Sequence, residues 1–277
     1  MDVAFLIIAH KNEHQLRRLV NHLASDFAVY LHINSKSAMD LTGLVNAVVS
    51  TSRVDWGAFS QIKATLRLLK ESSTRGHDRY VLVSGQDLPL VNNRAINAFF
   101  EDSDSDFIEW ERLPRSIWLP KGGYDRLELF WEKSSAPIGV KIFGRSIREC
   151  QKHFGLYRRL QYECYGGSNW FNITRESAQY ILDFVTNIDK RYLGTYRFTR
   201  AADEIFFQTI LLNSRCASRC TNSSLRFIDW NAGTGGPRVL GINDFAHLTA
   251  SNELFARKFD EEVDSSIIDA IYERVGE

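Results

Sequence analysis

The chain has 277 residues, of which 44% are hydrophobic and 25% are charged. This composition is typical of a soluble globular protein and excludes a disordered, collagen-like or coiled-coil chain, and the length fits one α/β domain with an elaborated half. The 34 basic and 34 acidic residues balance, so no overall field draws the chain to nucleic acid or to an anionic membrane, and any such contact must come from a local patch.

The first third of the chain predicts a parallel α/β unit. An unbroken apolar run over 3–9 predicts a strand buried on both faces, and a second run over 27–33 predicts its neighbour. Residues 16–23 carry leucine and valine at helical spacing, a helix is expected from Ser60 as its N-cap, and a strand is expected over 80–84. Ligands in such sheets lie outside the carboxyl ends of the strands, so the residues that leave each strand are the first site candidates.

Residues 111–167 lose this periodicity, and proline and glycine punctuate them, so we predict an irregular insertion there. Eleven Lys and Arg against six Asp and Glu make the segment positive, and nine aromatic residues are interleaved with them. One interpretation is a solvent-exposed insertion in which only a few side chains pack into the core. The other is a platform for an acceptor or a lipid surface, because aromatic faces stack on sugar rings and cations hold anionic groups.

Regular patterns return after residue 167. We predict strands over 169–173 and 225–230, helices over 178–185 and 203–213, and a closing helix whose apolar positions run from 263 to 275. The whole chain, 1–277, is therefore expected to form a single domain. Asp203 and Glu204 open the helix over 203–213. An acid there stabilises a helix start, and a carboxylate held on rigid packing can also act as a general base.

Two cations stand between apolar residues in the segment FARKFD, where Arg257 and Lys258 follow Phe255 and Ala256. Such a pair is either a solvated charge or a diphosphate clamp, in which arginine offers a bidentate fork and lysine a point charge. Arg238, which follows a Gly-Gly-Pro turn, is a weaker third candidate.

Several other kinds of site are disfavoured. Neither GxGxxG nor GxxxxGKS occurs, which argues against dinucleotide and P-loop sites. The EDSDSD run over 101–106 contains two DxD triplets, but it precedes a predicted strand and is interpreted as a solvated loop. The four cysteines are interpreted as reduced thiols. No signal peptide and no stretch of membrane-spanning length is present in the sequence.

Eight segments together resemble a known family. In chain order they are LIIAHK, LHINSKS, WGAFS, VSGQDLPL, GGSNWF, DEIFFQTILLNS, LRFIDWN and LFARKFD. The series resembles the core-2/I-branching enzyme and peptide O-xylosyltransferase family, known as glycosyltransferase family 14, and looks closer to the xylosyltransferase branch. The resemblance covers about residues 3–260 and leaves only the insertion largely unmatched.

The resemblance implies a GT-A-like fold with a Rossmann-like, mostly parallel central sheet and flanking helices. It also implies inverting transfer from a UDP-sugar without a bound metal ion or other cofactor. Residues 1–110 would form the nucleotide-sugar-binding half and residues 168–277 the acceptor and catalytic half.

The resemblance also assigns roles to single residues. Glu204 matches the general base, and Arg257 and Lys258 match the cations that bind the diphosphate. His10, Trp56 and Asp87 fall in motifs that line the donor side, and Asn169 and Trp170 match a segment that faces donor sugar and acceptor. Asn34 departs from the pattern, because the family's HVDKRS reads HINSKS here and an amide replaces a carboxylate that would contact the donor. The donor sugar therefore stays open between xylose and N-acetylglucosamine.

The expected function is transfer of a sugar from a UDP-sugar to a hydroxyl of a glycan or lipid-linked saccharide, with no nucleic-acid partner. Animal members of the family carry an N-terminal anchor, whereas this sequence starts two residues before its first predicted strand. We therefore expect a cytoplasmic enzyme, with peripheral contact at the inner membrane face as a further hypothesis. The alternatives are a non-catalytic nucleotide-sugar or glycan-binding protein and a metal-dependent GT-A enzyme that uses the loop from Asp102 to Asp106.

Overall fold

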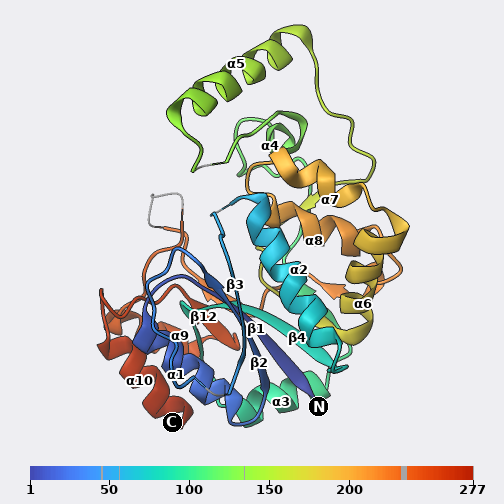
Figure 1. Ribbon diagram of the computed structural model, residues 1–277. Coiled ribbons are helices and arrows are strands. Elements are labelled where there is room, and N and C mark those ends of the chain that lie inside the picture. Colours follow the sequence, from blue (N-terminus) through green and yellow to red (C-terminus); the bar gives the residue numbers. More distant parts are fainter. Residues whose placement is uncertain (45, 56, 134, 232–235, 277) are drawn as a thin grey trace.

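The computed structural model of the chain describes residues 1–44, 46–55, 57–133, 135–231 and 236–276. It shows an α/β protein in which helices cover both faces of a central sheet of seven strands (Figure 1). From one edge to the other the strands are β10 (Cys220–Thr221), β6 (Asp106–Ile108), β9 (Phe171–Thr174), β4 (Arg79–Ser84), β1 (Val3–Ala9), β2 (Ala28–Asn34) and β3 (Val48–Ser52). The predicted α/β class is confirmed.

Strand direction explains how the insertion leaves the sheet. Six of the seven strands run the same way, and β9 runs antiparallel to both of its neighbours, β4 and β6. The sheet is therefore mostly parallel, as predicted, but β9 makes it mixed. Phe107 pairs with Asn172 and Ile108 with Phe171, so everything between β6 and β9 is the excursion of one long hairpin, which returns to the sheet without a crossover helix.

Two layers of helices form the main cores. One face of the sheet is covered by α2 (Phe59–Ser73), α6 (Arg175–Asp183) and α8 (Asp203–Leu212), and the other by α1 (Glu13–Ala24) and α3 (Asn93–Glu101). A third apolar cluster joins α9 (Phe245–Ala250) to α10 (Ser266–Val275). The structure also contains a short π-helical turn at Phe184–Ile188 and short 3-10 turns at Tyr196–Phe198, Ala217–Arg219 and Ile242–Asp244. Val263, assigned by periodicity to the closing helix, lies before α10 and is largely exposed.

A small second sheet continues from the carboxyl end of β4. It consists of β11 (Arg226–Ile228), β12 (Phe255–Arg257) and β5 (Asp87–Pro89), with β12 in the middle. The antiparallel register places Arg257 opposite Asp87. This pairing brings the FARKFD segment to the edge of the main sheet where ligands of α/β proteins lie.

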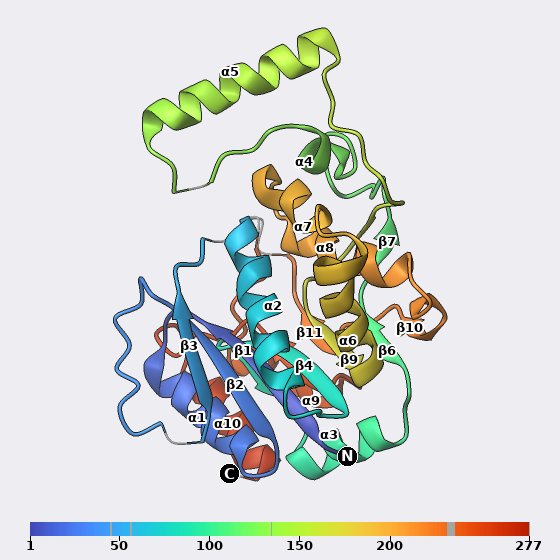
Figure 2. The same ribbon diagram turned by 45° about the vertical axis from the view of Figure 1, so that its right-hand side comes forward.

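The insertion contains more regular structure than the sequence predicted. Its base is a two-stranded ribbon of β7 (Glu111–Arg112) and β8 (Tyr165–Gly166), and it carries α4 (Tyr124–Glu128) and α5 (Ile138–Phe154). The prediction of an irregular segment is wrong for α5, which starts after Pro137 and ends at Gly155 in the left-handed conformation. In both views α5 stands beyond α4 and far from the sheet (Figure 1 and Figure 2). None of the helices in the described ranges combines the length and the apolar character that a membrane span needs.

Candidate active site

Basic side chains from two distant segments meet beyond the carboxyl end of β1. His10 and Lys11 leave that strand, and Lys258 follows β12. Desolvation and then the charges of Lys11 and Lys258 lower the pKa of His10, and desolvation followed by the charge of Lys11 lowers the pKa of Lys258. Asp260 pairs with Lys11 and accepts a 2.8 Å hydrogen bond from Asn12 Nδ2. One carboxylate thus faces several basic groups, an arrangement that favours a polyvalent anion.

Arg257 is held beside this cluster by an aromatic ring and a buried acid. Its guanidinium carbon lies 4.1 Å from the ring centroid of Trp170, and its Nε lies 3.5 Å from Asp87 Oδ1. The other oxygen of Asp87 lies 3.4 Å from Arg226 Nε, and Oδ1 also accepts a 2.7 Å hydrogen bond from Ser84. Burial lowers the pKa of Arg257. Asp87 is itself buried between the two arginines, so it positions Arg257 for a ligand.

Glu204 lies in the first turn of α8, where the helix dipole favours an acid. Its Oε2 accepts a 2.6 Å hydrogen bond from Arg126 Nη1, and the Arg126 guanidinium lies 3.8 Å from the centroid of the Trp118 ring. Burial raises the pKa of Glu204, and the charge of Arg126 partly offsets that effect. Burial and the neighbouring Glu204 raise the pKa of Asp203 to about 7. A carboxylate with a raised pKa and 29% of its side chain exposed is suited to accept a proton.

The GGSNW segment connects the acid to the cations. Gly167 N donates to Glu204 O at 2.9 Å, and Trp170 at the other end stacks on Arg257. Three residue steps of at most about 3.6 Å each separate Gly167 from Trp170, so their backbones lie within roughly 11 Å. Asn169 lies between them and is buried. The structure therefore brings Glu204, Asn169, Trp170 and Arg257 to one region.

Two glycines allow this segment to pass close to its neighbours. A Cβ on Gly166 would lie 2.5 Å from the Trp118 ring, and one on Gly167 would lie 1.9 Å from Glu109 O. Gln208, on α8, donates from Nε2 to Ser168 O at 2.6 Å. The segment is therefore fixed against both the insertion and the helix that carries Glu204.

Asn34 makes local contacts at the end of β2. Its Nδ2 donates to Val54 O at 2.7 Å and its Oδ1 accepts from Lys36 N at 3.2 Å, which ties the end of β2 to the loop after β3. The next residue in that loop, Asp55, is buried and lies 2.7 Å from Lys36 Nζ. Trp56, predicted on the donor side, lies outside the described residues.

Arg238 is neutralised by two carboxylates. It makes two hydrogen bonds to Asp244, at 2.9 and 2.7 Å, and one to Asp229 at 2.7 Å. Its segment reaches the site through Leu240 N, which donates to Lys258 O at 2.8 Å. The structure thus places Arg238 near the cation cluster but engages its charge elsewhere.

The EDSDSD run has structural roles. Asp106 is fully buried and accepts hydrogen bonds from Thr174 N at 2.7 Å and from Thr174 Oγ1 at 3.0 Å. The run ends on the first residue of β6, so it lies at the amino ends of the parallel strands, opposite the edge that carries His10. Within the described ranges, no three His, Cys, Asp or Glu side chains are grouped so that they could hold a metal ion. The four cysteines are free thiols.

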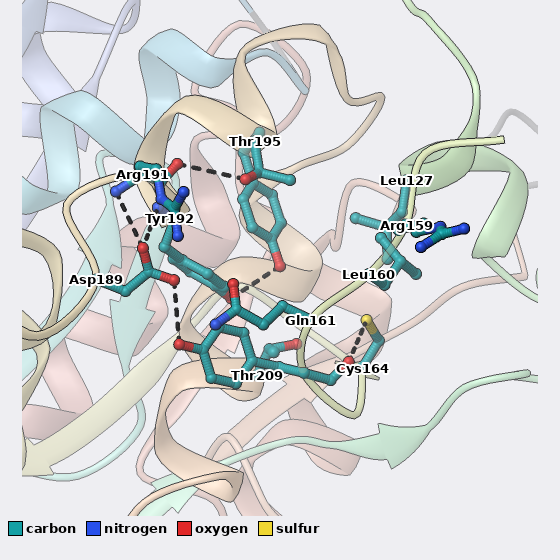
Figure 3. A pocket seen from close by; sticks show the side chains of 12 residues that line it. Leu127, Arg159, Leu160, Gln161, Cys164, Asp189, Arg191, Tyr192, Thr195 and Thr209 are labelled. Carbon is teal, nitrogen blue, oxygen red and sulfur yellow. Dashed lines mark hydrogen bonds between the residues drawn. The ribbon is translucent and has the colours of Figure 1, made fainter.

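A cavity of about 80 Å³ lies apart from the charged side chains described above (Figure 3). It is lined by one residue each of α4 and α8, Leu127 and Thr209, by two residues of α7 (Tyr192–Thr195), and by Arg159, Leu160, Gln161, Tyr162 and Cys164. On the cavity wall, the hydroxyls of Tyr192 and Tyr196 form a hydrogen bond of 2.8 Å with each other. The cavity contains none of the predicted site residues, and we place the candidate site where the charges converge.

Sequence reasoning missed three of the side chains that build this region. Lys11 directly follows a predicted site residue, but Asp260, the partner that holds it there, is 249 residues away in the sequence. Arg126 and Trp118 lie in the insertion, whose basic and aromatic composition was the only available signal. The contact of Arg126 with Glu204 spans 78 residues and has no local pattern, and Trp118 joins the region by stacking on Arg126.

Comparison with known proteins places the chain in a family. A family model described as Core-2/I-Branching enzyme matches residues 3–251. The chain belongs to this family. The core-2/I-branching family is a glycosyltransferase family, so the resemblance carried by the eight segments is confirmed.

Curated relatives of this core-2/I-branching family member are xylosyltransferases. Xylosyltransferase 2 of Rattus norvegicus is 24% identical over 304 aligned positions, which cover 97% of this chain and 33% of the rat protein. Xylosyltransferase 1 of Homo sapiens is 24% identical over 96% of this chain and 29% of its own length. The chain thus spans about a third of the length of these relatives. The predicted closeness to the xylosyltransferase branch agrees with this finding.

Proposed function

We propose that this family member is an inverting, metal-independent glycosyltransferase of GT-A-like fold. It moves a sugar from a UDP-sugar to a hydroxyl of a glycan or lipid-linked saccharide. The observation that carries the proposal is the arrangement along the GGSNW segment. A carboxylate with a raised pKa stands at one end of the segment. At the other end stands a largely buried arginine, beside a cluster of basic side chains that outnumber the acids around them.

The reaction is one in-line displacement at the anomeric carbon. The acceptor hydroxyl forms the new bond from the face opposite the leaving group, and its proton passes to an Oε atom of Glu204. The bond between the anomeric carbon and the diphosphate oxygen breaks, and its electron pair leaves with UDP. A positioned base of this kind contributes typically about 10²- to 10⁴-fold to the rate.

The cations stabilise the charge that develops on UDP. Arg257 and Lys258 are the primary pair, with His10 and Lys11 beside them. Because Trp170 and Asp87 already fix Arg257, little reorganisation is required as the bond breaks, which is the condition for effective electrostatic stabilisation.

The engagement of Asp87 supports independence from metal. A metal-dependent site needs carboxylate oxygens that face the ligand. The acid at the end of β4 instead directs its two oxygens to Arg257 and Arg226. The cation cluster supplies the positive charge that a metal ion would otherwise provide.

The acceptor side is formed by the insertion and the GGSNW segment. Arg126 bonds Glu204 and stacks on Trp118, and an aromatic ring near a base is a common surface for a sugar ring. Arg126 donates to Oε2 of Glu204, so the acceptor hydroxyl can donate to the other carboxylate oxygen. Xylose and N-acetylglucosamine are the proposed donor sugars.

A matched pair of substitutions separates catalysis from donor binding. Glu204→Gln should lower turnover about 10²- to 10⁴-fold and leave UDP affinity unchanged, because only the base is lost. Arg257→Ala should weaken UDP binding about 10- to 150-fold, since a charge-assisted hydrogen bond is worth about 1.5 to 3 kcal/mol. The exposed α10 residues Glu273 and Arg274 provide controls, as Glu273→Gln and Arg274→Ala.

The measurements are UDP titration by calorimetry and transfer or hydrolysis of UDP-xylose, UDP-N-acetylglucosamine, UDP-glucose and UDP-galactose. Near-normal turnover of Glu204→Gln would refute its assignment as the base. Binding of a UDP-sugar by the unaltered chain with neither hydrolysis nor transfer would favour a non-catalytic nucleotide-sugar-binding protein.

A further inference from the structure

Helix α5 is almost entirely exposed. Of its 17 residues, only Gly144 is buried. The helix is held to the rest of the insertion along one face, where Arg148 pairs with Glu132 and Gln151 accepts a 2.8 Å hydrogen bond from Phe130 N. A Cβ on Gly144 would lie 2.2 Å from Glu132 Oε2, so this glycine allows the close approach. The attachment is thus mostly polar and leaves the remaining faces open.

An apolar stripe runs along a different face of the helix. It consists of Val140, Phe143, Ile147, Cys150 and Phe154, whose spacing of three and four residues keeps them on one side. Phe143 and Phe154 are each 67% exposed. Ile147 is half-buried and the other four are exposed, so most of the stripe does not pack on the protein, which contacts the face that carries Gly144, Arg148 and Gln151. Ile138 and Ile142 add further exposed apolar surface.

The polar side of α5 is basic. Arg148 and Lys152 pair with Glu132 and Glu149, whereas no ion pair is found for Lys141 or Arg145 within the part of the chain that the structure describes. The surrounding charge has the same sign. Residues 111–167 contain eleven basic and six acidic residues, and subtracting them from the 34 of each leaves 23 basic against 28 acidic in the rest of the chain. The insertion is thus positive and the remainder negative.

We propose that α5 lies in the surface of an anionic lipid bilayer, with the stripe from Val140 to Phe154 at the level of the headgroups and upper acyl chains. An exposed helix with an apolar stripe, phenylalanine within it and lysine and arginine on the polar side has the properties of an interfacial helix. The basic side chains extend along the helix to reach lipid phosphates. The charge separation between insertion and remainder orients the molecule with α5 toward the membrane.

A second copy of the chain is a less suitable occupant. The stripe covers little more than two heptads, and a two-stranded coil so short is marginal in water. Gly139 and Gly144 lower its helical stability further. A pair joined through the stripe would also leave the basic polar side facing water, whereas anionic lipid neutralises it.

Vesicle flotation with the full chain tests the proposal. The chain should float with vesicles of phosphatidylcholine mixed with phosphatidylglycerol, float much less with phosphatidylcholine alone, and be released by salt. Lys141→Gln combined with Arg145→Gln should lower the partition coefficient about 30-fold, at the contribution of each cation near an anionic surface. Phe143→Asp should lower it at least as far. Val263→Asp is the matched control, because Val263 is 66% exposed and lies outside α5.

Cys150 gives an independent measurement, because it is the exposed cysteine of the four. An environment-sensitive dye attached there should shift to the blue with anionic vesicles and stay unshifted with neutral ones. Equal loss of flotation in Phe143→Asp and Val263→Asp, or no flotation of the unaltered chain, would overturn the proposal. A change of solution mass with Phe143→Asp, without vesicle binding, would overturn it in favour of a second copy. These readouts require no sugar transfer, so they are independent of the proposed enzymatic function.

Discussion

Arg126 controls the proton affinity of the proposed base, so Arg126→Ala should move the acidic limb of the pH-activity profile. Arg126 Nη1 lies 2.6 Å from Glu204 Oε2, with side-chain exposures of 19% and 29%. Burial raises the pKa of Glu204, and the charge and hydrogen bond of Arg126 act against that rise. Removing the arginine leaves only the weaker effect of the Arg115 charge to oppose burial, so the pKa of Glu204 should rise further.

The direction and size of the effect follow from this contact. Glu204 must be deprotonated to accept the acceptor proton, so activity falls as the pH falls through its pKa. A higher pKa therefore moves the acidic limb toward higher pH. A charge-assisted hydrogen bond is worth about 1.5 to 3 kcal/mol, and 1.36 kcal/mol corresponds to one pH unit, so the midpoint should move up by about one to two pH units.

The assay is kcat/KM for the acceptor across the pH range at saturating UDP-sugar. Arg126→Lys is the matched control, because it keeps the positive charge, and its acidic limb should stay near that of the unaltered protein. UDP affinity should be the same in both variants, since Arg126 does not contact the cation cluster. If Arg126→Ala lost activity equally at every pH, the contact would serve to position groups and would not set the pKa of Glu204.

Three further outcomes are expected. Turnover should survive EDTA, measured by UDP release, and a loss restored by manganese would place a metal in the site. Asp87→Asn should lower the melting temperature by about 6 to 20 °C, because it leaves Arg226 and Arg257 buried without their shared carboxylate, which costs about 3 to 5 kcal/mol of folding free energy. An unchanged melting temperature would show that the carboxylate is dispensable. Gly166→Ala should cost about 1 to 3 kcal/mol in urea unfolding, because its Cβ collides with Trp118, and unaltered stability would contradict the packing.

The central strands and the helices α1, α2, α6 and α8 were predictable because their patterns are local, whereas α3 was not predicted. The apolar runs over 3–9 and 80–84 are buried on both faces, and the helix near residue 203 carries its acids in the first turn. Where the local pattern was weak, prediction failed. The strand β3 reads VVSTS at the sheet edge, with both valines exposed, and β12 has only three residues. In α5, glycines and an unburied apolar stripe hid a regular helix.

By itself, the sequence determined the α/β class, the family, and a set of residue types suited to sugar transfer. Only the tertiary structure decided which of them meet. The pairs Arg126 with Glu204 and Lys11 with Asp260 join segments 78 and 249 residues apart, and the register of β12 against β5 places Asp87 beside Arg257. Periodicity and capping act over a few residues, whereas the charge around a carboxylate or a guanidinium depends on strand order and on the path of the insertion.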